Sequence, residues 1–307
     1  MAELLKGAPV AEAILKQVRE DTGALKQNNV VPTLAVFRVG ERAEDISYEK
    51  SAMKRCEQAG IAVKQTILPA DTDSETFFRT LQALNEDKSV HGILLFRPLP
   101  AHLDGEQARQ MLRPEKDVDG CTDGSLAGVF TNQAQGFPPC TAQAVMEILH
   151  HYGVNPAGMK TAVIGRSLVI GRPVAMMLMH EQATVCICHT RTQDVSSITR
   201  SADLVIAASG QMESIGAAYL SEGQIVIDVG INWNEEKQKM CGDVRFEEAE
   251  ALVKAITPVP GGVGGVTSAV LCKHVAKAAK RSISCSAFQS APDVLYSSGK
   301  KNETNQV

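Results

Sequence analysis

KTAVIGRSLVIGRP, residues 160–173, predicts a short buried strand, a tight turn opened by Gly165 and a helix that starts near Gly171. In such a unit the free backbone N–H groups at the start of the helix point toward whatever lies over the end of the strand. A phosphate or pyrophosphate group suits that place. The spacing G-x-S-x-x-x-G differs from the dinucleotide fingerprint G-x-G-x-x-G, so a strand–turn–helix corner without a ligand also fits this stretch.

The segment after this unit favours a nucleotide-binding site over a strand–turn–helix corner without a ligand. A second apolar run, residues 183–188 (ATVCIC), is followed by HTRT at residues 189–192. NAD-binding chains usually carry an acidic residue at the end of this strand, where it binds the ribose hydroxyls. Here no acidic residue occurs before Asp194, and hydroxyls together with Arg191 take its place. That exchange fits a 2′-phosphate and predicts NADP as the cofactor.

Apolar runs alternate with helix-compatible segments along the whole chain. In the second half, two more β-rich runs cover residues 203–209 and 224–230, and the four runs together predict a Rossmann-type parallel sheet with helices on its faces. The first half has its own alternation, with helices predicted over residues 10–26, 44–59 and 71–85 and strands over 32–39, 62–68 and 91–96. The sequence therefore predicts an α/β protein with two α/β domains.

Two segments rich in glycine and proline interrupt the alternation. Residues 114–139 are expected to form a long surface or cleft loop, after which a helix runs over residues 140–152. Residues 257–267 form a glycine-rich loop before a last helix at 268–281. Such a loop lets the backbone approach a ligand closely, although a flexible hinge fits as well. Beyond Ser282 the sequence is polar and patternless, which predicts a weakly ordered tail.

Composition narrows the class of protein. A chain of 307 residues can hold two domains, and 44% hydrophobic with 21% charged residues is ordinary for a soluble globular protein. The net charge of −4 gives no indication of a nucleic-acid partner. No apolar run approaches the roughly 18 to 20 residues that span a bilayer, and the N-terminus lacks the apolar region of a signal peptide. We expect a cytoplasmic protein with no membrane and no nucleic-acid partner.

The cysteines and histidines indicate neither disulfides nor metal. The 8 cysteines are scattered without a C-x-x-C pair, and Cys186 and Cys188 lie inside a predicted strand. The 7 histidines have no metal-ligand spacing. Reduced cysteines and the absence of a metal site are therefore expected.

Several separated motifs occur together in one order. They are PEKDVDG (114–120), PCT (139–141), VIGRS with GRP (163–173), DVGIN (228–232) and TPVPGGVG (257–264). On these motifs the chain resembles the methylenetetrahydrofolate dehydrogenase/methenyltetrahydrofolate cyclohydrolase family, also called the bifunctional folate enzyme. The resemblance covers nearly the whole chain to about Arg281.

The resemblance implies an organisation of the chain. Two α/β domains would enclose a cleft that holds the folate, and the last helix would return to the first domain. Residues 1–140 with 268–282 would form the folate-binding catalytic domain, 141–267 the NADP-binding Rossmann domain and 283–307 the weakly ordered tail. The resemblance also implies tetrahydrofolate one-carbon derivatives as substrates and a homodimer, for which the run at 203–209 or a neighbouring strand is a candidate edge.

Two residues would form the folate side of the site by resemblance. Asp119 would hydrogen-bond the pterin ring, because a carboxylate matches its adjacent N–H donors. Tyr48 would pack on the folate and orient it. A half-buried helix aromatic is the alternative for Tyr48, and a turn-forming role is common for an Asp beside Gly.

Five residues would surround the cofactor by resemblance. The phosphate of NADP would be held by Arg166, Ser167 and Thr190, while Gly165 and Ile231 would contribute backbone around the cofactor.

The chain departs from the family at two linked positions. The family places a catalytic lysine four residues after the tyrosine, on the same helix face, and counting from Tyr48 leads to Ala52. The glutamine that partners this lysine is replaced by Phe96. Lys50 and Lys54 lie two residues to either side of Ala52, roughly 200° around the helix, so neither simply substitutes.

The two reactions of the family make different demands on these positions. Oxidation of 5,10-methylenetetrahydrofolate moves a hydride to the nicotinamide and mainly requires two ligands to be positioned. Hydrolysis of the methenyl product requires a proton donor and acceptor, which Ala52 cannot be. We therefore expect an NADP-dependent dehydrogenase whose cyclohydrolase activity is in doubt. A fully bifunctional enzyme with another acid/base group and a non-catalytic folate or dinucleotide sensor are the alternatives.

Overall fold

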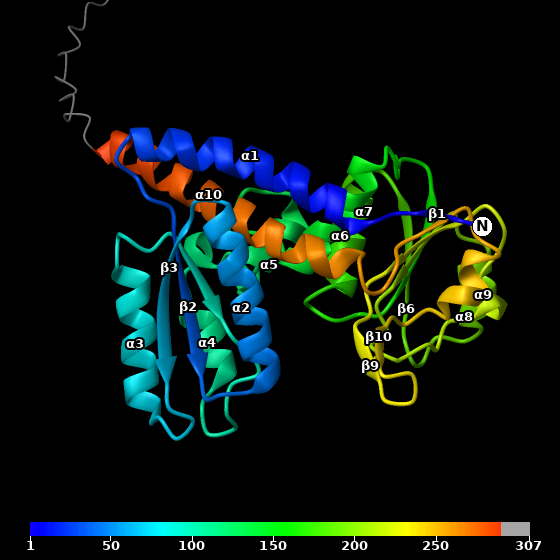
Figure 1. Cartoon of the computed structure of the whole chain (residues 1–307), viewed down its shortest axis with the longest axis horizontal. Helices are drawn as coiled ribbons and strands as arrows, with labels where there is room; N and C mark the ends of the chain where they lie inside the picture. The colour runs from blue at the N-terminus through cyan, green and yellow to red at the C-terminus, as the bar shows by residue number, and fades with distance from the viewer. Residues whose placement is uncertain (290–307) are drawn as a thin grey trace, which may run out of the picture.

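The computed structural model describes residues 1–289, and side chains through residue 283. Two α/β halves lie next to one another, and two long helices run along both of them (Figure 1). These helices are α1 (Gly7–Gln27) and α10 (Val263–Gln289), which pack against each other. The two expected α/β domains are confirmed. Within residues 1–289, no helix combines the length and apolarity needed to cross a membrane.

The second half contains a parallel sheet of six strands. Their order is β1 (Glu3–Leu4), β11 (Ala255–Ile256), β8 (Ile225–Asp228), β7 (Leu204–Ala207), β5 (Lys160–Ile164) and β6 (Thr184–Cys188). The Rossmann-type parallel sheet predicted from the four longer runs is confirmed. The strands β1 and β11 escaped prediction because two residues show no periodicity. β7 is an interior strand, so the proposed edge at 203–209 is wrong and β6 is the edge beyond β5.

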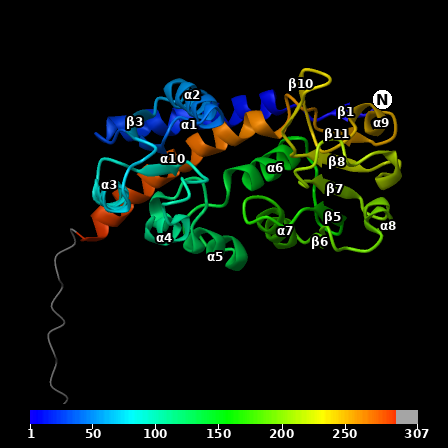
Figure 2. The ribbon, with the colours of Figure 1, turned by 90° about the horizontal axis from the view of Figure 1, so that it is seen from below.

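Alternation along β5 explains how helices cover both faces of this sheet. Val163 belongs to the apolar cluster shared with α6 (Cys140–His151) and α7 (Gly171–His180). Its neighbours Ala162 and Ile164 point the other way, into a cluster near α8 (Val195–Arg200) and α9 (Phe246–Glu250). Because successive strand residues face opposite sides, a strand apolar at every position is buried on both. Figure 2 shows α7 and α8 on opposite sides of the strands β5 and β6.

The first half is built on a smaller parallel sheet. Its order is β3 (Ala62–Leu68), β2 (Thr33–Val39) and β4 (Gly92–Leu95). The helices α2 (Ala43–Gln58) and α3 (Ser74–Glu86) follow β2 and β3. All of these elements were expected from the sequence, within three residues at each end. The start of α3 is fixed by Asp73, whose carboxylate accepts a hydrogen bond from the Thr76 N–H at 2.8 Å.

The expectation of a long loop at residues 114–139 is wrong. The segment contains a short 3-10 helix, η1 (Pro114–Lys116), and the helix α5 (Asp123–Thr131). Glycines at two positions of α5 lower its helix propensity and hid it from sequence reasoning. A further helix, α4 (Gly105–Met111), was also not predicted.

Asp117 organises this segment from within. Its side chain is fully buried and accepts hydrogen bonds from the N–H groups of Cys121 (3.0 Å) and Thr122 (2.7 Å). The Ser125 hydroxyl donates a third bond at 2.7 Å. A buried carboxylate is stable only when such donors replace water, so this network holds the first turn of α5.

The last helix is longer than predicted at both ends. It begins at Val263, inside the glycine-rich loop, instead of at residue 268. Val263 and Val266 are buried, and their packing compensates for two glycines in the first turn. The helix continues through Gln289, whereas a tail was expected from residue 283; residues 290–307 of that tail lie outside the described residues.

Replacing Asp117 with Ala tests the role of this network. We expect a loss of about 3 kcal/mol in the free energy of unfolding, because two buried N–H groups and a hydroxyl lose their acceptor. Chemical denaturation measures it. The control is Asp123→Ala, which removes an exposed carboxylate paired with Arg109 and should change stability by less than about 1 kcal/mol. Equal losses in the two variants would contradict the assignment.

Candidate active site

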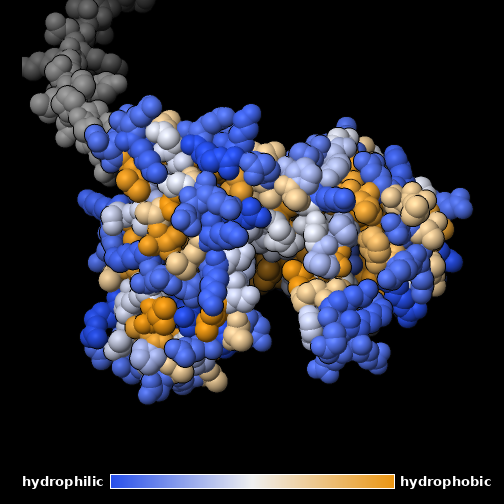
Figure 3. Space-filling view, in the orientation of Figure 1, coloured by the Kyte–Doolittle hydropathy of each residue, from blue (hydrophilic) through white to orange (hydrophobic). Residues whose placement is uncertain are grey.

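A deep hollow opens between the two halves, with α2 on one side and the hairpin β9 (Asn232–Asn234) and β10 (Lys239–Cys241) on the other (Figures 1 and 3). The α2 wall of this hollow has an apolar stripe of residues four apart. Tyr48 is half-buried, and its ring lies 5.9 Å from the Phe96 ring in an edge-on arrangement. Ala52, one turn later, is fully buried. Another turn on, the Cys56 sulfur lies 3.9 Å from the Cys272 sulfur of α10. The side chains on this face of α2, around Ala52, therefore pack against the rest of the protein.

The lysines that flank Ala52 point elsewhere. Lys50 and Lys54 are both exposed, as the helical geometry predicts for residues two positions away from a buried one.

A buried ion pair fixes α2 on the small sheet. The Arg38 Nε of β2 lies 2.8 Å from the Glu49 Oε2, and both side chains are almost unexposed. The Gln65 amide donates to the other carboxylate oxygen of Glu49 at 2.6 Å. Since removal of either charge would leave its partner buried and unpaired, this pair sets the position of the helix that carries Tyr48.

Asp119 lies in the turn after η1 and faces a cation. The Arg97 Nη2 lies 3.7 Å from the Asp119 Oδ2, and the Asp119 side chain retains 28% of its exposure. Burial raises the pKa of Asp119 to about 6, and the nearby Arg97 lowers that pKa while Asp117 raises it. Burial and the charge of Asp119 hold the pKa of Tyr48 well above its usual range. Tyr48 and Asp119 therefore face one recessed space, with Tyr48 protonated.

Arg97 is the residue of this site that sequence reasoning missed. It follows the carboxyl end of β4, where loops of a parallel sheet gather functional groups. Its position directly after the strand is the signal in the sequence that indicates it.

The turn after β5 forms the floor of a groove. Gly165 has a φ of 128°, and a Cβ there would lie 2.1 Å from the Ala208 carbonyl oxygen. A Cβ on Gly171 would lie 2.2 Å from the Gly165 carbonyl oxygen. Both positions therefore require glycine, which brings the start of α7 directly over the end of β5. This confirms the strand, turn and helix predicted from residues 160–173.

The groove is a cavity of about 410 Å³ at the carboxyl ends of β5, β6 and β7. It gathers four of the five residues expected around a cofactor, namely Gly165, Arg166, Ser167 and Thr190. Arg191 does not line it, although the sequence argument used this residue. Thr192, the second hydroxyl of the segment at 189–192, also lines it, and further lining groups that the sequence did not indicate are His189, Ser209, Ser214 and Tyr219.

Ile231 lies in a neighbouring cavity of about 170 Å³, between the end of β8 and the glycine-rich loop. It is 60% exposed, and its Cδ1 would lie 3.1 Å from a Cβ on Gly264. Asp228, at the other end of this cavity, accepts hydrogen bonds from the N–H groups of Gly230, Asp243 and Val244. Burial raises the pKa of Asp228 to about 7. This carboxyl group therefore fixes the loop that carries Ile231.

The described residues include no group of three His, Cys, Asp or Glu side chains arranged to hold a metal ion. Within residues 1–283, whose side chains are described, the seven cysteines are all free thiols.

The groove lies at the carboxyl ends of a parallel sheet, and glycines form its floor. A second α/β domain with a recessed carboxyl group faces it. These features define a two-domain dinucleotide-binding enzyme of the dehydrogenase class. The chain belongs to the tetrahydrofolate dehydrogenase/cyclohydrolase family. Residues 5–119 match the catalytic domain of that family and residues 139–283 its NAD(P)-binding domain. The resemblance drawn from the motifs is confirmed.

Individual relatives agree with this assignment. The bifunctional protein FolD of Carboxydothermus hydrogenoformans is 46% identical over 279 residues, which cover 91% of this chain and 97% of the relative. The crystal structure of the bifunctional FolD methylenetetrahydrofolate dehydrogenase/cyclohydrolase of Campylobacter jejuni has a TM-score of 0.89 at 38% identity and covers 92% of this chain and 99% of that one. The Trypanosoma brucei enzyme, solved with NADP cofactor and inhibitor, has a TM-score of 0.86 at 34% identity, covering 92% and 98%.

Replacing Arg97 with Leu tests the electrostatics of the site. A nearby cation favours the ionised carboxyl, so its removal should raise the pKa of Asp119 further above about 6. The pH dependence of the Asp119 carboxyl ¹³C chemical shift measures this midpoint. Arg55→Leu, which removes a cation that does not act on Asp119, should leave the midpoint unchanged. An unchanged midpoint in the Arg97 variant would refute the pairing.

Proposed function

We propose that this protein oxidises 5,10-methylenetetrahydrofolate to 5,10-methenyltetrahydrofolate with NADP, and that its cyclohydrolase activity is weak or absent. One observation carries the second part. Ala52 is fully buried and the Phe96 ring packs near Tyr48, at the two positions where family resemblance places a lysine and its glutamine partner. Both members of the polar pair are replaced by apolar residues that pack in the core. This joint replacement supports a changed site more strongly than the replacement of one member would.

The remaining residues suit a reaction that depends on positioning. NADP accepts the hydride when bound, and the groove around Gly165, Arg166 and Ser167 fits its phosphates because the glycine turn brings backbone N–H groups close. Asp119 would accept hydrogen bonds from the pterin, and Arg97 favours the ionised carboxylate that can do so. Tyr48 would orient the folate, and Thr190 and Ile231 would contact the cofactor.

Hydrolysis of the methenyl product needs a group that gives and takes a proton. The guanidinium of Arg97 keeps its proton at any ordinary pH. Asp119 is the one specific argument for the fully bifunctional alternative, because a pKa of about 6 lies in the range of a general acid or base. In the role implied by the family resemblance, however, the Asp119 carboxylate already accepts hydrogen bonds from the pterin. Formation of NADPH from methylenetetrahydrofolate separates either enzyme from a non-catalytic sensor.

The larger organisation follows the family as well. We assign residues 1–140 with 268–282 to the folate-binding domain and 141–267 to the NADP-binding domain, with β1 crossing over to the sheet of the second. We also assign a homodimer, for which the edge strand β6 offers unpaired backbone groups, and a location in the cytoplasm, which the seven free cysteines support.

The first test follows the hydrolysis of methenyltetrahydrofolate by its absorbance at near-neutral pH. We expect a rate close to the uncatalysed one, together with robust NADPH formation from methylenetetrahydrofolate. The double variant Ala52→Lys with Phe96→Gln should raise the hydrolysis rate by tenfold or more, since a positioned acid/base group is worth about 10² to 10⁴-fold.

The matched control is Ser51→Lys with Phe96→Gln, which adds the lysine on the exposed side of the same helix and should gain nothing. Rapid hydrolysis by the natural chain would reject the loss of cyclohydrolase activity and favour the fully bifunctional alternative.

A second test concerns the cofactor. Arg166→Gln should raise KM for NADP by about tenfold or more, because a charge-assisted bond to the 2′-phosphate is lost, and leave KM for NAD nearly unchanged. Arg191→Gln is the matched control, since Arg191 does not line the groove. A similar rise for both cofactors would place Arg166 elsewhere than at the 2′-phosphate.

A further inference from the structure

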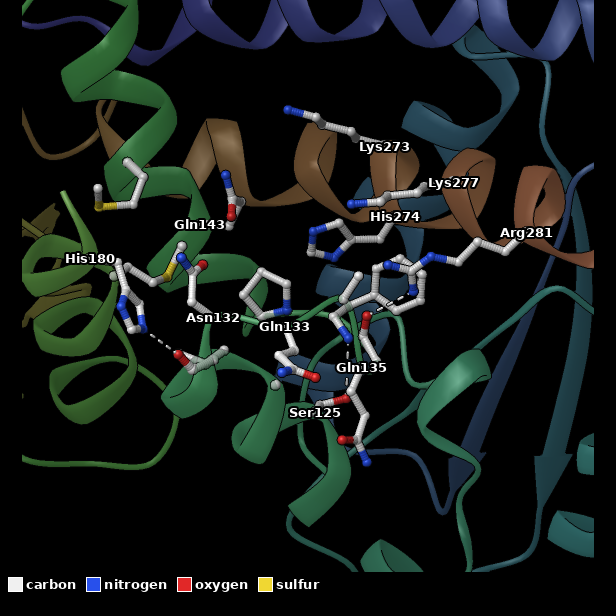
Figure 4. Close-up of a pocket in the computed structure, with 18 of the residues that line it drawn as sticks. Ser125, Asn132, Gln133, Gln135, Gln143, His180, Lys273, His274, Lys277 and Arg281 are labelled. Atoms are coloured by element: carbon white, nitrogen blue, oxygen red, sulfur yellow. Dashed lines mark hydrogen bonds between the residues drawn. The ribbon is translucent and has the colours of Figure 1, made fainter. Parts of the chain in front are cut away.

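A second cavity of about 370 Å³ lies away from the hollow between the halves (Figure 4). Its walls come from the later turns of α10 and from α5, α6 and α7. None of the residues assigned above to the folate or to NADP lines it. It is therefore a separate site, and its volume falls within the roughly 300 to 1,000 Å³ typical of small-molecule pockets.

One wall carries three cations on successive turns of α10, namely Lys273, Lys277 and Arg281. Two of them are engaged by the protein. The Lys273 Nζ lies 2.6 Å from the Glu147 carboxylate. The Arg281 guanidinium donates to the Gly136 carbonyl at 2.9 Å and lies 4.6 Å from the centre of the Phe137 ring.

Lys277, between them, has no hydrogen-bond or ion-pair partner among the residues whose side chains are described. Like charges one helical turn apart repel each other. Burial lowers the pKa of Lys277, and the charges of Arg281 and Lys273 lower it further. An anion placed in the cavity beside Lys277 would relieve both penalties.

The same helix, α10, adds a further hydrogen-bonding group. His274 is only 4% exposed, and its Nδ1 lies 2.9 Å from the Val118 carbonyl oxygen, so this nitrogen carries the proton. Burial lowers the pKa of His274 to about 4, so the ring is neutral near pH 7. The hydrogen bonds of His274 in the described part of the chain all involve Nδ1, so its Nε2 remains an acceptor, and the residue lines the cavity next to Lys277 (Figure 4).

Part of the remaining lining is apolar. Pro138 and Met177, both partly exposed, provide apolar surface beside the polar side chains of Gln133 and Gln143. The Met177 side chain can adjust its shape to a ligand. The single carboxylate of the lining, Glu181, already contacts the His150 ring at 2.7 Å and so is engaged away from Lys277.

We propose that this cavity binds an organic anion, whose carboxylate or phosphate group pairs with Lys277 beside Arg281 and whose aromatic body lies on Pro138 and Met177. Such a site combines apolar lining with a few convergent polar groups, as small-molecule sites do. The proposal is independent of the reaction assigned to the cleft.

Isothermal titration calorimetry of the full chain tests it with three probes of one shape: 1-naphthyl phosphate, 1-naphthoate and the uncharged 1-naphthalenemethanol. Saturating NADP is present throughout, so that the nucleotide groove is closed to the probes. We expect both anions to bind one site per chain and the alcohol to bind at least tenfold more weakly. The stronger of the two anions identifies the preferred head group.

Lys277→Gln should weaken anion binding by tenfold or more. Lys280→Gln removes the same charge from another side of α10, where Lys280 pairs with Asp21, and should leave anion binding unchanged. The Lys277 variant should keep its melting temperature, because it removes a charge that lies between two like charges. Absence of saturable binding, equal binding of the alcohol, or full affinity in the Lys277 variant would overturn the proposal.

Discussion

The burial of α10 is the constraint on which the rest of the structure depends. One apolar cluster extends from Leu34 and Val36 of the small sheet, through Ala52 and Cys56 of α2, to α10 and on to the large sheet. The helix contacts α1, α2 and α6 along its length, so both halves share part of a single core. Close-packed protein interiors resist small displacements. The packing of α10 therefore keeps the two halves, and the hollow between them, in place.

The same helix explains why the candidate sites lie where they do. Its first turn carries the glycine-rich loop beside Ile231, and its middle places Cys272 against Cys56 behind Ala52. Two residues further along, His274 donates to the carbonyl of Val118, which is next to Asp119 in the sequence. The proposed anion site begins on that same turn. A single rigid element thus borders the cofactor side, the folate side and the separate cavity.

The electrostatics of the cleft differ from what a lysine-bearing site would have. Ala52 and Phe96 are apolar, and the cation that faces Asp119 is Arg97, at 3.7 Å. A guanidinium can stabilise a carboxylate without exchanging its proton. The arrangement suits binding and hydride transfer, where positioning dominates, more than hydrolysis, where a proton must move.

The sequence by itself determined the alternation of strands and helices, the glycine turn at Gly165 and the family, because periodicity and glycine requirements are local properties of the chain. Helical spacing placed Ala52 on the same helix face as Tyr48, whereas the family resemblance identified Phe96. Only the tertiary structure decided that Asp117 holds α5, that Arg97 meets Asp119 and that Lys277 faces a cavity without a partner. These contacts join segments whose approach depends on the packing of whole elements, and no local pattern encodes that packing.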